Sequence, residues 1–362
     1  MEAPQFGSPL PVPNVKDLAK KPMNQVPQRY VRTDLADPPF TSFYDSAMSS
    51  QFPVIDLARL ASFDTKISEL EKLDLACKEW GFFHVINHGV SLSLVEDMKN
   101  KTVEFFELPI EEKDRYRQLP GELQGFGQLF VMSDDQKLDW ADMMYIVPFP
   151  KHMGSRLLEK LPLEFRETVE AYSEATRDLA MKLLSIMADA LKIDPRYMMD
   201  LFEEGRQDLR FNYYPPCLQP DLVMGLAPHS DPGALTILLH VNEVAGLQVK
   251  KDGKWILVNP LPVAFIVNIG DLLEVVTNGT YNSIEHRAII NSTKERLTLA
   301  SFLNMKLDVI VGPAPFRVTP ESPAIFGQIS FDDLTKRFFG KKLYGKSLID
   351  GLRLPKEVTP SQ

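Results

Sequence analysis

The sequence has few thiols and no long apolar run. Only Cys77 and Cys217 occur among its 362 residues, too few for a disulfide framework or a thiolate zinc site. No stretch approaches the ~20 continuous apolar residues that a membrane-spanning helix needs. The N-terminus lacks the basic-then-apolar pattern of a signal peptide. We therefore expect a cytoplasmic protein whose redox chemistry, if it has any, comes from a cofactor.

Basic charge is also in short supply. The chain has 40 Lys and Arg residues against 49 Asp and Glu residues, a formal net charge of −9. This balance disfavours nucleic acid and anionic membranes as the main partners, although a local basic pocket for a small anion is compatible with it. With 44% hydrophobic and 25% charged residues, the composition is that of a globular protein. We expect a monomer that binds small molecules.

The texture of the sequence changes along the chain. Residues 1–50 are rich in proline and polar residues, which predicts an extended arm that wraps the body. Residues 51–200 are predicted to be mainly helical, and the longest helix spans 163–191, where apolar residues recur at spacings of three and four. Residues 311–362 are predicted to form a C-terminal segment that closes the barrel described next.

Short β-like runs fill the segment 201–310. Glycine, proline, asparagine or aspartate separates them, and this pattern predicts a β-barrel or sandwich. Asp252-Gly253 is a two-residue hairpin signal, so part of the sheet is expected to be antiparallel. The predicted strands are 209–214, 234–239, 246–250, 254–258, 264–269, 272–276, 286–290 and 296–303.

Histidine is rare enough to limit any histidine-based site, since six occur in the chain. His229 and Asp231 are two residues apart, so on an extended strand their side chains project to one face, ~6–7 Å apart along the chain. His286 follows on another predicted strand. Two imidazoles and one carboxylate on one side of a metal are typical of non-haem Fe(II) oxygenases. Zinc fits less well, because the helical motif of zinc hydrolases is missing. A chance occurrence of His-x-Asp is the alternative.

A second group of residues favours an anion site near the metal. Arg296 lies ten residues after His286, and Thr298 lies on the same face of the same predicted strand. A guanidinium beside a hydroxyl suits the capture of a carboxylate. The alternative is a surface ion pair between Arg296 and Glu295.

Many ordered motifs extend over nearly the whole chain. They include PVIDL at 53–57, ACKEWGFFHVINHG at 76–89, FNYYPPC at 211–217, GLAPHSD at 225–231 and ERLTLASF at 295–302. With these motifs the sequence resembles the plant 2-oxoglutarate/Fe(II)-dependent dioxygenases of specialised metabolism. This group includes flavonoid oxidases, alkaloid O-demethylases and strigolactone-pathway oxidases. The resemblance implies an α+β fold whose core is a double-stranded β-helix, or jelly roll.

The resemblance also implies roles for individual residues. His229, Asp231 and His286 would bind Fe(II), and Arg296 and Thr298 would hold the C5 carboxylate of 2-oxoglutarate. Thr298 stands where the family usually has serine, but the hydroxyl is retained. Further predicted site residues are Tyr214 and Asn212 for 2-oxoglutarate, and Met143, Met144, Tyr145, Phe302 and Asn304 for the substrate.

The expected reaction is the hydroxylation, O-demethylation or desaturation of a small, largely apolar metabolite. O₂ and 2-oxoglutarate would be co-substrates, with ascorbate as reductant. Methionines at such spacing are also common in simple cores, so the substrate residues rest on the resemblance.

Two other classes of function stay open at this point. Residues 340–347 match the phosphate-loop pattern of nucleotide hydrolases, but the segment before them has helical character and few residues follow. The other alternative is a metal-containing β-barrel that binds a ligand without turnover.

Overall fold

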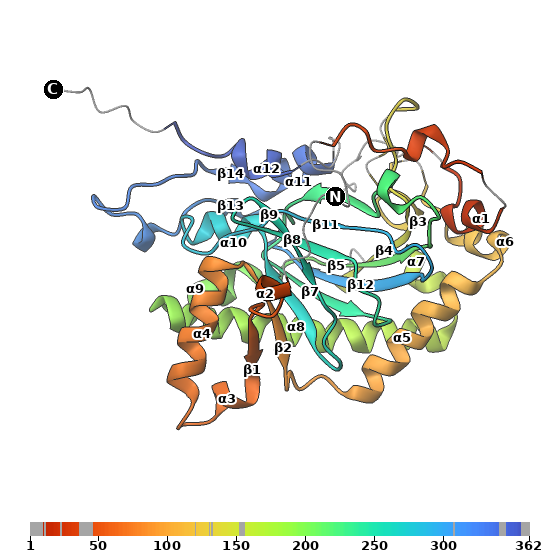
Figure 1. Cartoon of the computed structure of the whole chain (residues 1–362). Coiled ribbons are helices and arrows are strands. Elements are labelled where there is room, and N and C mark those ends of the chain that lie inside the picture. Colours follow the sequence, from red (N-terminus) through yellow and green to blue (C-terminus); the bar gives the residue numbers. More distant parts are fainter. Residues whose placement is uncertain are drawn as a thin grey trace.

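The computed structural model describes residues 10, 12–21, 24–35, 46–119, 121–129, 131, 133–151, 156–306, 308–339 and 345–355. Two β-sheets face each other at the centre of the molecule, and helices cover the outer face of the larger one (Figure 1). The strands are β1 (Val54–Asp56), β2 (Phe82–Ile86), β3 (Gly125–Gly127), β4 (Asp142–Phe149), β5 (Gln207–Tyr214), β6 (Leu226–His229), β7 (Leu235–His240), β8 (Leu247–Lys251), β9 (Lys254–Val258), β10 (Phe265–Ile269), β11 (His286–Ala288), β12 (Arg296–Leu303), β13 (Ile310–Val311) and β14 (Ile329–Ser330).

The larger sheet has eight strands in the order β1-β2-β10-β7-β12-β5-β4-β3, and the smaller has four in the order β6-β11-β8-β9. Apart from the parallel pair β1 and β2, the neighbouring strands of both sheets are antiparallel. Asp252 and Gly253 connect β8 to β9 with positive φ angles, which confirms the predicted hairpin. Strands from 51–200 and from 201–310 share the larger sheet, so these two regions form one body.

A layer of helices packs against the outer face of the larger sheet. In Figure 1 the long helix α8 runs beneath the strands, with α4 and α5 beside it. The helices are α1 (Val15–Lys20), α2 (Ser46–Ser49), α3 (Leu57–Ala61), α4 (Lys66–Glu79), α5 (Leu92–Glu107), α6 (Ile110–Lys113), α7 (Arg156–Lys160), α8 (Leu163–Leu191), α9 (Pro195–Phe202), α10 (Asp271–Val276), α11 (Phe331–Phe339) and α12 (Ser347–Asp350). The bounds of α8 are those predicted from its apolar spacing.

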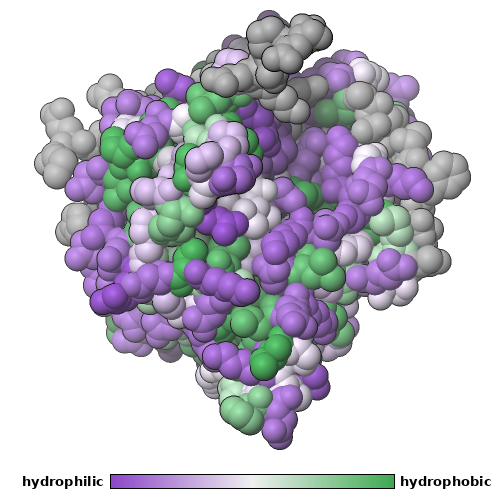
Figure 2. Space-filling view, turned by 90° about the vertical axis from the view of Figure 1, so that its left-hand side faces the viewer, coloured by the Kyte–Doolittle hydropathy of each residue, from purple (hydrophilic) through white to green (hydrophobic). Residues whose placement is uncertain are grey.

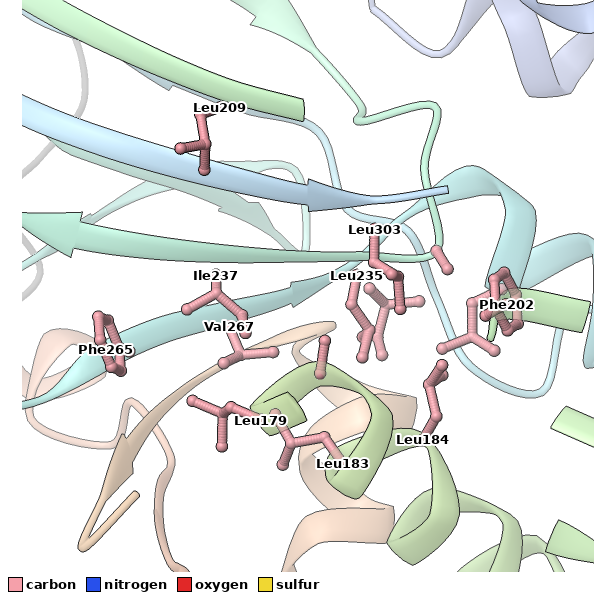
Figure 3. Packing of buried hydrophobic residues seen from close by; sticks show 14 of the residues in the cluster. Leu179, Leu183, Leu184, Phe202, Leu209, Leu235, Ile237, Phe265, Val267 and Leu303 are labelled. Atoms are coloured by element: carbon pink, nitrogen blue, oxygen red, sulfur yellow. The ribbon is translucent and has the colours of Figure 1, made fainter. Parts of the chain in front are cut away.

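The main core lies between α8 and this sheet. Figure 3 shows Leu179, Leu183 and Leu184 of α8 pointing toward side chains of the strands, among them Ile237 and Val267. Because successive strand residues point to opposite faces, the other half of each strand faces the smaller sheet. The layer architecture confirms the predicted α+β fold. Side chains on the inner faces of the two sheets line a cavity between them.

One predicted strand is a helix. Residues 272–276 belong to α10, which begins directly after Gly270 at the end of β10. Leu272, Leu273, Val275 and Val276 are all buried. A short apolar run that is buried on every side has the same pattern in a helix and in a strand, so periodicity gave no basis for choosing between them.

One of the described helices of the N-terminal arm, α1, is held by a buried carboxylate. The buried carboxylate of Asp142, at the start of β4, accepts hydrogen bonds from the backbone N–H groups of Val15 and Lys16 at 2.9 Å each. Asn14, the N-cap residue of α1, donates a third hydrogen bond to it. A carboxylate at a helix N-terminus satisfies N–H groups that have no partner within the helix. Asp142 therefore fixes α1 against the larger sheet.

The surface is mixed in character. On the face shown in Figure 2, hydrophobic residues lie in small groups among hydrophilic ones, as is common for globular proteins. Among the described residues, we find no helix with both the length and the apolar character needed to cross a membrane.

Candidate active site

Three potential metal ligands lie close together at one end of strands β6 and β11 of the smaller sheet. His229 ends β6 and pairs directly with His286 of β11 in the antiparallel register, and their rings lie 4.3 Å apart between centroids. Asp231 Oδ1 lies 3.5 Å from His229 Nε2 and 3.6 Å from His286 Nε2. The strand ends before Asp231, so the turn after β6, and not a shared strand face as predicted, brings the carboxylate to the imidazoles.

Backbone carbonyl groups orient both imidazoles. His229 Nδ1 lies 2.7 Å from the carbonyl oxygen of Ala227, and His286 Nδ1 lies 3.1 Å from that of Ile284. Each carbonyl accepts a hydrogen bond from Nδ1–H, which leaves the lone pair of each Nε2 directed to the other members of the triad. The two histidines are therefore held in the tautomer that a metal ligand requires.

The two oxygens of Asp231 have different surroundings. Oδ2 accepts hydrogen bonds from Thr236 Oγ1 at 2.6 Å and from Asn268 Nδ2 at 2.9 Å. Oδ1 faces the two imidazoles. Such supporting hydrogen bonds fix a ligand carboxylate in orientation. Neither Thr236 nor Asn268 was predicted as a site residue, although a polar residue within the apolar run of β10 is a signal that could have singled out Asn268.

Protonation states also suit metal binding. Burial lowers the pKa of His286 to about 4, with a further contribution from His229. Burial alone would raise the pKa of Asp231, but His286, His229 and Thr236 together hold it below its usual range. At neutral pH the site therefore offers a neutral imidazole at His286 and an ionised carboxylate at Asp231, the forms in which these residues bind metals.

Arg296 supplies a buried positive charge in the same cavity. It pairs with Tyr214 across β12 and β5, and its guanidinium lies 5.2 Å from the centroid of that ring. No ion pair to a carboxylate is found for it among the described residues, and its Nε has no hydrogen-bond partner there. Glu295 instead accepts a hydrogen bond from Tyr213, so the alternative of an Arg296–Glu295 pair is wrong. A buried guanidinium in this state is suited to an anionic ligand.

Two more predicted residues stand beside Arg296. Thr298 pairs with Asn212 in the register, and Asn212 Nδ2 donates a hydrogen bond to Thr298 Oγ1 at 3.2 Å. All four residues, Arg296, Thr298, Tyr214 and Asn212, line the cavity that also contains the triad. The structure therefore brings together the predicted metal ligands and the predicted anion site.

The residues predicted to contact substrate divide into two groups. Tyr145, Phe302 and Asn304 line the cavity. Met143 lines a second cavity that shares Leu129, Arg210 and Leu226 with the first.

The prediction that Met144 contacts substrate is wrong. This residue is fully buried in the core against the helices, because its neighbours Met143 and Tyr145 on β4 occupy the cavity face and successive residues alternate.

Sequence reasoning missed a buried polar network in the cavity wall. Asp208 forms an ion pair with Arg206 at 2.9 Å, and it accepts hydrogen bonds from Asn304 Nδ2 at 2.7 Å and from the hydroxyl of Tyr145. Arg210 lies between this network and Asn212 on β5. Counting back in steps of two from Asn212 would have placed these side chains on the cavity face.

The C-terminal helix α11 covers this cavity. Its apolar face contributes Phe331, Leu334, Phe338 and Phe339, together with Thr335, to the lining. The helix spans Phe331–Phe339, in agreement with the helical character predicted for the segment before residue 340, and in Figure 1 it lies on the side of the strands opposite α8.

The structure contradicts a phosphate loop at 340–347. A helix, α11, precedes the segment where that loop requires a strand, and the helix after it, α12, has only four residues. Lys346, which would bind phosphate, instead forms an ion pair with Glu274 at 2.9 Å. Residues 340–344 lie outside the described part of the chain.

The donor set fits Fe(II). Cis ligands at about 2.1 Å from a metal lie about 3 Å apart, so the distances of 3.5 and 3.6 Å from Asp231 Oδ1 to the two imidazoles need only a small inward movement of side chains. Two neutral nitrogens and one carboxylate oxygen form the facial arrangement of non-haem iron sites, which keeps further positions for exogenous ligands. Arg296 lines the same cavity, where its buried charge would suit an anionic ligand beside such a metal.

Comparisons with known proteins agree with this geometry. Residues 205–305 match the 2OG-Fe(II) oxygenase superfamily, and residues 52–164 match the N-terminal region described as non-haem dioxygenase in morphine synthesis. The chain is 49% identical over 358 residues to oxoglutarate-dependent flavonoid 7-O-demethylase 1 of Ocimum basilicum, covering 98% of this chain and 94% of the relative. It is 44% identical over 362 residues to codeine O-demethylase of Papaver somniferum, covering 98% and 100%.

A solved structure shows the same fold. The crystal structure of JOX2 in complex with 2OG, Fe, and JA superimposes with a TM-score of 0.86 at 34% identity, covering 96% of this chain and all of that one. Together with the triad and the jelly-roll core, these similarities show that the chain belongs to the 2OG-Fe(II) oxygenase superfamily, whose enzymes use Fe(II) and 2-oxoglutarate to oxidise small molecules.

Proposed function

We propose that this dioxygenase removes a methyl group from a small, largely apolar, methoxylated plant metabolite. One observation carries the proposal: the triad and Arg296 lie in the same cavity, and most of its walls are apolar. Arg296 has no ion pair to a carboxylate among the described residues, so it is available for an anionic co-substrate. Two relatives with 49% and 44% identity are named as O-demethylases, which favours this outcome over hydroxylation or desaturation.

Each group of residues has a role in this proposal. His229, Asp231 and His286 hold the iron, and Arg296 with Thr298 holds the distal carboxylate of 2-oxoglutarate while Tyr214 and Asn212 fix Arg296 and Thr298. Iron held there, with 2-oxoglutarate as co-substrate, would supply the oxidation of a C–H bond by O₂. The protein decides which bond reacts, because only the group held next to the metal is within reach.

The cavity walls support the substrate class. Phe82, Leu238 and Leu247 line it from the sheets, and the apolar face of α11 closes it. The buried charges of Arg206 and Asp208 neutralise each other, and Arg210 on the same wall has an Nε without a hydrogen-bond partner, so this wall offers hydrogen bonds to a polar group of the substrate. A flat molecule with one or two oxygen substituents, such as a flavonoid or alkaloid, satisfies both conditions. We further propose that the enzyme acts as a monomer in the cytoplasm.

The test is an assay of the purified chain with Fe(II), 2-oxoglutarate, ascorbate, O₂ and a panel of methoxylated flavonoids and alkaloids. We expect succinate and formaldehyde in equal amounts and a product lighter by about 14 mass units, as loss of a methyl group requires. Asp231→Ala is the matched control and should give neither. A product heavier by about 16 mass units would show that the enzyme hydroxylates its substrate and does not demethylate it. An absence of succinate with every compound would favour ligand binding without turnover.

A further inference from the structure

A buried carboxylate outside the cavity joins three parts of the chain. Glu274 lies on α10, and its side chain is only 3% exposed. Its Oε2 accepts hydrogen bonds from the backbone N–H of Ser283 at 2.7 Å and from Lys346 Nζ at 2.9 Å. Its Oε1 accepts one from Arg353 Nη2 at 2.8 Å. Both cations come from the C-terminal segment, while Ser283 precedes the metal ligand His286.

The segment that carries Lys346 also touches the strand of another metal ligand. Gly345 N–H donates a hydrogen bond to the carbonyl of Pro228 at 2.8 Å, and Ser230 N–H donates one to the carbonyl of Gly345 at 3.2 Å. These bonds form an isolated parallel bridge between Gly345 and His229. Lys346 Nζ additionally donates to the carbonyl of Ser283 at 2.6 Å. The C-terminal segment therefore reaches the chain next to both histidines of the triad.

The same segment includes the cover of the cavity. The apolar face of helix α11 covers the cavity, and residues 345–355 come later in the chain. A carboxylate as buried as that of Glu274 is stable only when it is paired and hydrogen-bonded. Glu274 therefore strongly favours the state in which Lys346 and Arg353 stay bound to it. In this arrangement, release of Lys346 and Arg353 would leave the carboxylate without its charged partners.

We propose that Glu274 is a positioning residue that clasps the C-terminal cover, α11 with residues 345–355, over the active site. The clasp is formed by Glu274 with Lys346 and Arg353. It ties closure of the cover to the chain segments that present His229 and His286. A closed cover excludes water from the cavity, so the clasp favours oxidation of the bound substrate over 2-oxoglutarate turnover without product. The effect on turnover rests on the proposed function of the cavity, whereas the clasp itself does not.

Hydrogen exchange of the full-length apo protein tests the clasp directly. The variants are Lys346→Met, which removes one cation at a partly exposed position, and Glu274→Gln, which removes the buried charge. We expect amide exchange in 331–339 and 345–355 to become at least about tenfold faster in both variants, since loss of one partner of a buried charge pair is strongly destabilising. Exchange in α8 should stay as in the wild type. Lys346→Arg keeps the charge and should restore protection.

Lys336→Met is the matched control, because Lys336 lies on α11 itself but pairs with the exposed Asp332. It should leave exchange unchanged. The proposal is overturned if Lys346→Met leaves exchange in 345–355 at the wild-type rate. It is equally overturned if that variant accelerates exchange in α8 as much as in the cover, because Lys346 would then contribute only to global stability.

A second readout separates the clasp from the function of the cavity. With a confirmed substrate, Lys346→Met should lower the ratio of product to succinate and raise KM for the substrate severalfold, with KM for 2-oxoglutarate nearly unchanged. An unchanged product-to-succinate ratio together with faster exchange would refute the role in coupling. If no substrate is found, the exchange experiment still decides whether the clasp exists.

Discussion

At the scale of single residues, hydrogen bonds within the protein orient the carboxylate of Asp231, which we propose as a metal ligand. One oxygen is held by Thr236 and Asn268, and the other faces the imidazoles. The orientation of the carboxylate is thus set by hydrogen bonds that do not involve the metal. Affinity for iron should therefore depend on residues that never touch it.

Thr236→Val tests this dependence with little change in shape. Loss of the hydroxyl removes one of the two hydrogen bonds to Asp231 Oδ2 and should weaken Fe(II) binding by about 10- to 100-fold. Titration of the apo protein with Fe(II) under anaerobic conditions measures the effect. Thr277→Val is the control, because its hydroxyl bonds only to the backbone of α10 and its loop. Equal Fe(II) affinity in the Thr236 variant and the wild type would contradict the prediction.

Arg296→Lys tests the anion site at constant charge. Lysine loses the planar fork that can bind a carboxylate with two hydrogen bonds, so KM for 2-oxoglutarate should rise at least about tenfold, while Fe(II) affinity stays unchanged. Steady-state kinetics at varied 2-oxoglutarate measures this. Thr298→Ser, which retains the hydroxyl that Asn212 contacts, should behave like the wild type. If lysine supports the wild-type KM, another group must hold the distal carboxylate.

At the scale of elements, strand alternation separates stability from specificity on β4. Met144 faces the core against the helices, whereas Tyr145 faces the cavity and bonds to Asp208. Met144→Ala should lower the free energy of unfolding by about 2–5 kcal/mol through the void it leaves, without changing product identity. Tyr145→Phe should alter substrate KM or product ratio and change stability by less than this. Urea unfolding and product analysis of both variants test these expectations. Altered products for Met144→Ala with unchanged stability would place Met144 in the cavity and contradict its assignment to the core.

At the scale of the whole molecule, burial of histidine makes the fold sensitive to acid. His84 is buried against the ring of Phe52, and burial lowers its pKa to about 4. In the unfolded chain it takes up a proton below about pH 6.5, whereas in the fold it stays neutral until about pH 4. The unfolded state therefore binds more protons between these values, and stability falls as the pH falls through this window.

His84→Gln should remove part of this acid sensitivity. The contribution of His84 is at most about 1.4 kcal/mol per pH unit within the window, so between pH 7.5 and 5 the wild type should lose about 1–2 kcal/mol more than the variant. Urea unfolding of both apo proteins at the two pH values measures the difference. Titrating groups that do not interact with His84 contribute equally to both proteins, so identical losses would show that His84 titrates normally.

Local patterns in the sequence determined much of this protein. Regular apolar spacing defined α8 from Leu163 to Leu191, and Asp252-Gly253 defined the hairpin between β8 and β9. Both depend on interactions between near neighbours, which the sequence displays. Residue type and spacing also indicated the three metal ligands and an anion site at Arg296 and Thr298. The motif resemblance added 2-oxoglutarate, the jelly-roll fold and the remaining site residues.

Only the tertiary structure decided the facts that depend on packing between distant segments. The run at 272–276 is a helix because its surroundings bury it on every side, and Met144 faces the core because β4 pairs with β5 in one particular register. The support of Asp231 by Asn268 and the contact of Glu274 with Lys346 join residues 37 and 72 positions apart. The free energy of such contacts comes from the assembled fold, which no local pattern encodes.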